Sequence, residues 1–143
     1  MPEAATPGSP PDTPVDDVIA RVRIPLIQRA TIVHADVQEE LFVIDIGLLG
    51  LFVERAAALP VGDSVSVRLP LPGNVIPIQA WCRVAWWHQP GRHLVTKSLP
   101  AGLGLEFVEI SASDRIRVRQ LVVEYLQRHP QLRRFHRPAG PAL

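Results

Sequence analysis

The sequence predicts a mainly β protein, a six-stranded antiparallel β-barrel followed by one C-terminal α-helix. Two observations carry this prediction. Up to Val108, apolar and polar residues alternate with a period of two in short runs separated by turn residues, which is typical of half-buried strands. After Val108, apolar residues recur every three or four positions, as on an amphipathic helix. A length of 143 residues suits a single domain with its own core.

Six segments carry the strand pattern, and residues 64–69 show it most clearly, with valines and a leucine alternating with serines and an arginine. The other segments are residues 27–35, 39–45, 51–55, 75–88 and 102–108. In residues 75–88 unbroken alternation puts Ile76 and Trp86 on one face, with Trp81, Arg83 and Trp87 on the other. The helix is expected at about residues 113–128, with Ser111 or Ser113 as its N-cap and Ile116 in its apolar stripe.

The most informative stretch is residues 39–54, which reads as strand, tight turn and strand. Asp45 precedes the bend, and Gly47 and Gly50 stand within it. Glycine permits a positive φ or the close approach of another group to the backbone. Aspartate can bond the N–H groups of the turn or present a carboxylate to a ligand. Taken alone, the stretch is better interpreted as an ordinary hairpin corner.

The spacing Asp45-x-Gly47-x-x-Gly50 resembles the D/N-x-S-x-x-G signature of the PilZ family, bacterial receptors for the second messenger cyclic di-GMP. Residues 23–26 (RIPL) resemble the family's entry to the first strand, and residues 102–107 (GLGLEF) resemble its last strand. The resemblance covers about residues 21–126. It implies a barrel with a C-terminal helix and a binding site for the dinucleotide.

In that family an R-x-x-x-R pair in the N-terminal segment holds the ligand together with the signature. The resemblance places Arg23 at the second arginine, whereas the first falls at Ile19 and Arg21 is out of register. Gly47 stands in place of the serine, which removes a hydroxyl that could bond the ligand. This degenerate pattern predicts weak or no binding of cyclic di-GMP. The candidate ligand-binding residues are Arg21, Arg23, Asp45, Gly47 and Gly50.

A second candidate site is a protein-interaction face on the longest strand, formed by Trp81, Arg83 and Trp87. Tryptophan and arginine are enriched at the energetic centres of protein interfaces. The simpler alternative is that the C-terminal helix covers the two rings.

Two hypotheses of function follow from these sites. The first is a PilZ-like adaptor that contacts another bacterial protein, of a motility or surface-regulation system. The second is a functional cyclic di-GMP receptor that uses Arg21, Arg23 and residues 45–50. No cofactor other than this possible ligand is expected.

Composition and motifs argue against other classes of function. The net charge of +1 is too small to indicate nucleic-acid binding. The single cysteine, Cys82, excludes an intrachain disulfide and a cysteine-based zinc site, and the five histidines are scattered. No nucleophile, phosphate-loop or metal-ligand motif occurs, so neither an enzyme nor a metal site is expected. The absence of a long apolar stretch and of a leader predicts a cytoplasmic protein.

The chain divides into three parts by composition. Residues 1–17 are rich in proline and small residues and are expected to be a disordered tail. Residues 18–129 are expected to form the PilZ-like domain. Residues 130–143 carry arginines without a core pattern and are expected to be a flexible basic tail.

Overall fold

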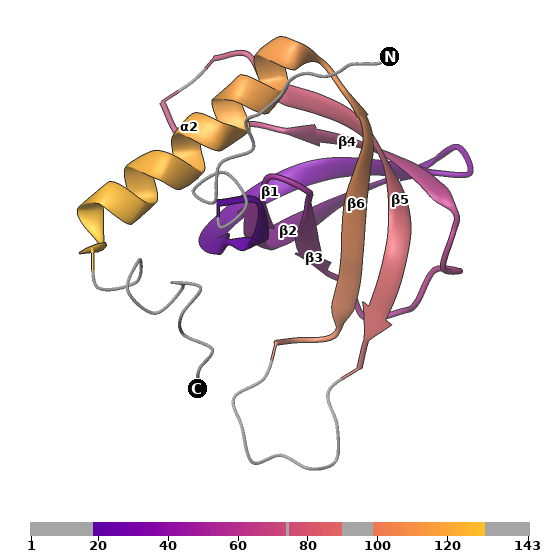
Figure 1. The fold of residues 1–143 in the computed structure, drawn as a ribbon. Coiled ribbons are helices and arrows are strands. Elements are labelled where there is room, and N and C mark those ends of the chain that lie inside the picture. Colours follow the sequence, from indigo (N-terminus) through magenta and orange to yellow (C-terminus); the bar gives the residue numbers. More distant parts are fainter. Residues whose placement is uncertain (1–18, 74, 90–98, 131–143) are drawn as a thin grey trace, which may run out of the picture.

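The computed structural model describes residues 19–73, 75–89 and 99–130 (Figure 1). Its centre is a closed barrel of antiparallel strands in the spatial order β1-β2-β3-β6-β5-β4. The helix α2 (Ala112–Arg128) follows the last strand and lies across one side of the barrel, so the predicted fold class is confirmed. The strands are β1 (Arg23–His34), β2 (Val37–Gly47), β3 (Gly50–Glu54), β4 (Ser64–Leu69), β5 (Ile78–His88) and β6 (Gly102–Ile110).

The observed strand boundaries agree best with the predicted ones where apolar and polar residues alternate without a break. β4 has the predicted residues. β1 begins earlier than predicted, at Arg23, because its start pairs with the end of β2 at Gly47. β5 begins later than predicted, after Pro77, and the preceding Ile76 is 69% exposed rather than inside the barrel. Proline lacks the N–H that a ladder needs, which accounts for the late start.

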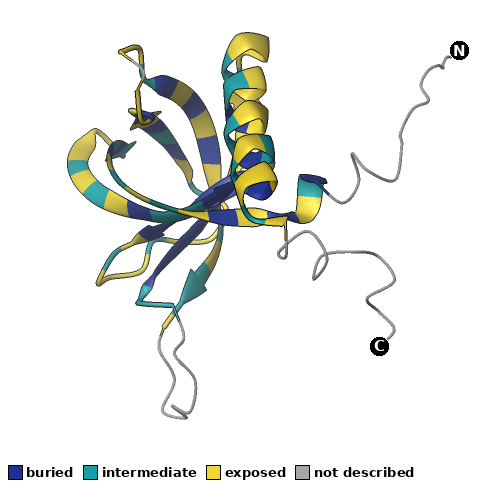
Figure 2. Cartoon of the chain, turned by 90° about the vertical axis from the view of Figure 1, so that its left-hand side faces the viewer, coloured by how far each residue is buried: buried dark blue, intermediate teal, exposed yellow. Residues whose placement is uncertain are grey.

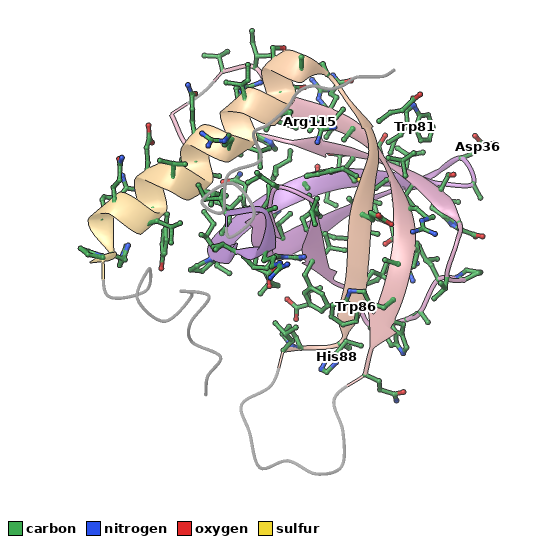
Figure 3. The ribbon with its side chains drawn as sticks, viewed as in Figure 1. Asp36, Trp81, Trp86, His88 and Arg115 are labelled. Carbon is green, nitrogen blue, oxygen red and sulfur yellow. The ribbon has the colours of Figure 1, made fainter. Side chains whose placement is uncertain are left out.

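The connection between β1 and β2 is a two-residue turn made of Ala35 and Asp36. Both residues have positive φ values, 49° and 66° respectively. Such a turn matches the twist of a hairpin, but glycine and asparagine are its usual residues. The backbone is therefore strained at this exposed hairpin tip. Figure 3 labels Asp36 at the tip.

The core fills the barrel and continues under α2. Buried and exposed residues alternate along the strands, as the banded colouring of Figure 2 shows. Ser111 caps the helix by accepting a hydrogen bond of 3.0 Å from the backbone N–H of Asp114. The helix buries Val118, Val122 and Leu126, whereas Ile116 is 55% exposed, so its predicted place in the apolar stripe is wrong.

A break in the pairing of β5 with β6 reverses the second half of β5. Val84 pairs with Leu105 and Trp86 with Gly104, which leaves Ala85 as an extra residue on β5. One extra residue moves every later side chain to the opposite face. Trp86 is accordingly exposed, and Trp87 packs partly buried against the core. The prediction from unbroken alternation, with Trp86 inside and Trp87 outside, is wrong.

The tails expected at residues 1–17 and 130–143 lie outside the described residues, apart from Pro130. In the part of the chain that the structure describes, no helix has both the length and the apolar character needed to cross a membrane.

Candidate functional site

The signature turn, residues 45–50, joins β2 to β3 through Leu48 and Leu49. The start of β1 lies beside it, because Arg23 pairs with Gly47 and Pro25 with Asp45. The Arg23 guanidinium donates to Asp45 Oδ1 from Nε at 2.9 Å, and its Nη2 lies 2.7 Å from the same oxygen. The two side chains that match the family's charged positions are therefore bound to each other, and they are 39% and 21% exposed.

The segment before β1, residues 19–22, is called the lead below, and it is closed onto this turn. Ile19 is 9% exposed and Val22 is 1% exposed, and both belong to the core. The backbone N–H of Val22 donates to the Ile19 carbonyl at 3.1 Å, which folds the lead into a tight turn. Ile19, where the family pattern has an arginine, thus serves as a core residue.

Gly47 makes this closure possible. A Cβ on Gly47 would stand 2.5 Å from the Val22 carbonyl oxygen and 3.0 Å from Cδ of Arg23. The first distance is too short for any side chain unless the lead moves. The absence of the family's serine hydroxyl at this position therefore goes together with a lead that fills the space above the turn.

Gly50 has a different neighbour. It begins β3 and pairs with Glu106 of β6, so close that an added Cβ would collide with the Leu105 backbone. Gly50 therefore allows β3 and β6 to approach each other closely in the wall of the barrel. Of the candidate ligand-binding residues, the structure brings Arg23, Asp45 and Gly47 together, and Arg21 lies in the same lead with an exposed side chain.

An aromatic cluster that the sequence did not reveal lies beside the signature turn. Phe52 pairs with Asp45 on one side and with Gly104 on the other. Its ring stacks on Trp86 with centroids 5.3 Å apart, and His88 meets both rings edge-on at 6.4 and 6.1 Å. Figure 3 shows Trp86 and His88 close together near the end of β5.

Glycines beneath these rings were the available sequence signal for the cluster. A Cβ on Gly104 would collide with the Trp86 indole, and one on Gly102 would collide with the Phe52 ring. The His88 Nε2 atom is buried and has no hydrogen-bond partner among the described residues. The cluster therefore forms an apolar wall next to the Arg23–Asp45 pair.

The predicted protein-interaction face is partly formed. Trp81 is 52% exposed, so α2 does not cover it, and its neighbours across the sheet are Ser66 and Glu109. Arg83 also points outward and forms an ion pair with Glu106. Trp87 lies on the other side of the sheet because of the break at Ala85, and it does not join Trp81.

The shifted pKa values of Glu39 and Cys82 have structural explanations. The Arg55 guanidinium donates to both oxygens of Glu39, at 3.0 and 2.8 Å, and lowers the pKa of that carboxyl. Burial raises the pKa of the Cys82 thiol to about 12. No group of three or more potential metal ligands occurs among the described residues.

Comparison with known proteins settles the family. The model of the PilZ domain matches residues 20–124, which is well over half of the chain. This chain belongs to the PilZ domain family. No curated protein matches its sequence.

Two solved structures share the PilZ fold with this chain. One is the Bacillus subtilis inhibitor of motility, MotI/DgrA, with a TM-score of 0.62 and 19% identity over 75% of this chain and 50% of that chain. The present chain thus spans only half the length of that protein. The other is the PilZ domain with c-di-GMP of YcgR from Escherichia coli, with a TM-score of 0.55 and 13% identity over 78% and 93% of the two chains. At these identities the likeness shows the fold alone.

Proposed function

We propose that this PilZ domain is a regulatory adaptor of bacterial second-messenger and motility signalling that acts through protein–protein contact and binds cyclic di-GMP weakly or not at all. The motility context is taken from the family and from MotI, whose name describes an inhibitor of motility. The role is regulatory rather than catalytic, and the proposal places the chain in the cytoplasm. The partner is a second protein of such a regulatory system.

The closed lead is the observation that carries this proposal. A ligand at the signature turn would have to occupy the space that the Val22 carbonyl and the Arg23 side chain now fill above Gly47. Opening that space would take Val22 and Ile19 out of the core. Complete exposure of such side chains costs about 1.5–3 kcal/mol each.

The charged groups give a second argument. Arg23 would have to share its guanidinium between a ligand phosphate and Asp45, to which it is already bonded. The arginine expected one helical turn earlier is Ile19, and the serine hydroxyl is missing at Gly47. A hydrogen bond to a charged group contributes about 1.5–3 kcal/mol, so the loss of two such contacts weakens binding roughly a hundredfold or more.

The second candidate function is a working cyclic di-GMP receptor, and the exposed Arg21 favours it. Arg21 lies in the lead beside the signature turn. In this function the lead moves, and Arg21 supplies a second guanidinium to a ligand held by Arg23. Arginine suits both phosphate oxygens and the guanine edge.

Calorimetry with cyclic di-GMP separates the two functions. The full chain should give no saturable heat at micromolar ligand, and its melting temperature should not rise with added ligand. Saturable heat that Arg21→Ala and Arg23→Ala both abolish would establish the receptor and contradict the proposal. Arg128→Ala is the matched control, because Arg128 lies in the last turn of α2, outside the signature turn and the lead.

A further inference from the structure

The outer face of the barrel carries a groove that lies away from the signature turn. It has a volume of about 820 Å³ and runs across β1, the start of β2, β4, β5 and β6 to the start of α2. Trp81 and Arg115 both line it, and Figure 3 shows them at the same end of the barrel. Its other polar and charged lining side chains are Thr31, Gln38, Ser66, Arg68, Gln79, Glu109 and Ser111.

The arginines of the groove differ from most of the others in the described chain. Arg23, Arg29, Arg55, Arg83 and Arg117 each form an ion pair with a carboxylate. Arg68 and Arg115 form none with the described residues, and both are exposed. Glu109 is the single carboxylate among the described lining residues, so this part of the groove carries a net positive charge.

The geometry of the groove determines how an occupant would be recognised. The barrel is closed, and all six strands are paired on both sides, so no described strand offers an edge to an added strand. Recognition must therefore use side chains. Trp81 supplies the largest exposed apolar surface of the lining, and its cross-strand neighbour Ser66 keeps the space beside it open.

We propose that this groove binds an acidic segment of the partner protein, with carboxylates against Arg68 and Arg115 and an apolar or aromatic side chain against Trp81. The proposal rests on the adaptor function above and identifies the chemistry of the partner. The guanidinium fork matches a carboxylate in a bidentate geometry. Arginine and tryptophan are both enriched at interface hot spots.

Nucleic acid fits the groove less well than an acidic peptide does. Two arginines neutralise few phosphates, and Glu109 would repel the backbone of a strand laid across the sheet. A peptide can instead place a hydrogen-bond donor at Glu109 and its carboxylates at the two arginines. This complementarity favours a segment with acidic residues spaced around an apolar residue.

Random peptides displayed on phage, selected on the immobilised full chain, test the proposal. Selected peptides should carry carboxylates together with an aromatic or aliphatic residue. Arg68→Glu and Arg115→Glu should each weaken binding of the synthesised peptides roughly tenfold or more, as expected for a lost charged contact. Arg128→Glu changes the same charge on α2 outside the groove and should leave binding within about twofold.

A charge reversal gives the decisive result. Replacing the peptide carboxylates with lysines should abolish binding to the native chain and restore binding to Arg68→Glu. Failure to select any peptide, selection of peptides without carboxylates, or binding unchanged in both variants overturns the proposal. So does a single-stranded DNA oligomer that binds more tightly than the peptides in an Arg68-dependent manner. Calorimetry with cyclic di-GMP tests ligand binding at Arg23 and Asp45 and does not involve the groove. Failure of the adaptor function and failure of the groove proposal are therefore distinguishable.

Discussion

The substitution Gly47→Ser tests whether the lead is held on the signature turn. It restores the residue that the PilZ pattern has at this position, and it adds a Cβ 2.5 Å from the Val22 carbonyl oxygen. The neighbour is backbone, so it cannot rotate away as the end of a flexible side chain could. Either the lead moves outward or the turn distorts.

The loss of stability that Gly47→Ser causes can be estimated from the two ways of relieving this contact. Overpacking in a well-packed site costs about 1–3 kcal/mol. Complete release of Val22 and Ile19 would cost about 3–6 kcal/mol in lost burial, so partial displacement of the lead is the cheaper response. We expect a loss of about 2 kcal/mol, which increases the fraction of molecules with an open lead roughly thirtyfold. The melting temperature should fall by about 6–12 °C.

Limited proteolysis with trypsin detects the opening of the lead directly, because Arg21 is the first arginine or lysine of the chain. Cleavage after Arg21 requires the lead to leave the turn, and its rate follows the open population when closing is fast. Gly47→Ser should therefore be cut first at Arg21 under native conditions. Gly50→Ser is the matched control, because its Cβ collides with β6 rather than with the lead.

The control should also melt earlier, but its cleavage should spread over the barrel instead of starting at Arg21. A Gly47→Ser protein that melts within about 1 °C of the native chain and is cut at the native rate refutes the closed lead. Adding Ile19→Arg restores the family's first arginine but places a charge at a core position. The double variant should be less stable than Gly47→Ser alone, which limits any gain in affinity for cyclic di-GMP.

Three further predictions concern the barrel itself. Trp87→Ala should lower the free energy of unfolding by about 3 kcal/mol, and Trp81→Ala by less than about 1 kcal/mol, in chemical denaturation; equal losses would contradict the reversal of β5. The Cys82 thiol, with its pKa raised to about 12, should resist alkylation at pH 8 in the folded chain and react on unfolding; rapid labelling of folded protein would contradict its burial. The same shift means that stability falls as pH rises above about 9, because the unfolded thiol ionises first. Ala35→Asn with Asp36→Gly should stabilise the hairpin by about 1 kcal/mol, since both residues have positive φ; no rise in melting temperature would contradict a strained tip.

The fold was predictable because each strand has one face in the core. β4 shows this most simply, since its alternation holds from Ser64 to Leu69 and its boundaries agree with the structure. The sequence offered Ser111 or Ser113 as the helix cap, and the structure has Ser111 there, with Asp114 in the first turn. Ile116 failed because it stands two positions before Val118, about 200° around the helix from the face that Val118 shares with the other buried residues.

The direction of the tryptophans was not predictable from alternation. Val84, Ala85, Trp86 and Trp87 are all apolar, so the sequence gives no phase at the place where the extra residue enters. The phase depends on the neighbouring strand β6. Gly104 faces Trp86 and has no side chain, which leaves room for an indole on the outer surface. A pair of facing positions, and not one strand alone, decides which face a ring occupies.

The two departures from the family pattern have one structural cause. Read separately, Ile19 is a missing arginine and Gly47 is a missing hydroxyl, and each predicts only a weaker ligand contact. In the structure they depend on each other, because Ile19 anchors the lead in the core and Gly47 leaves the space in which Val22 crosses the turn. An arginine at position 19 would hold the lead away from the core, and a serine at position 47 would push it off the turn. The two positions at which the chain departs from the family's binding pattern are therefore the same positions that keep the lead closed.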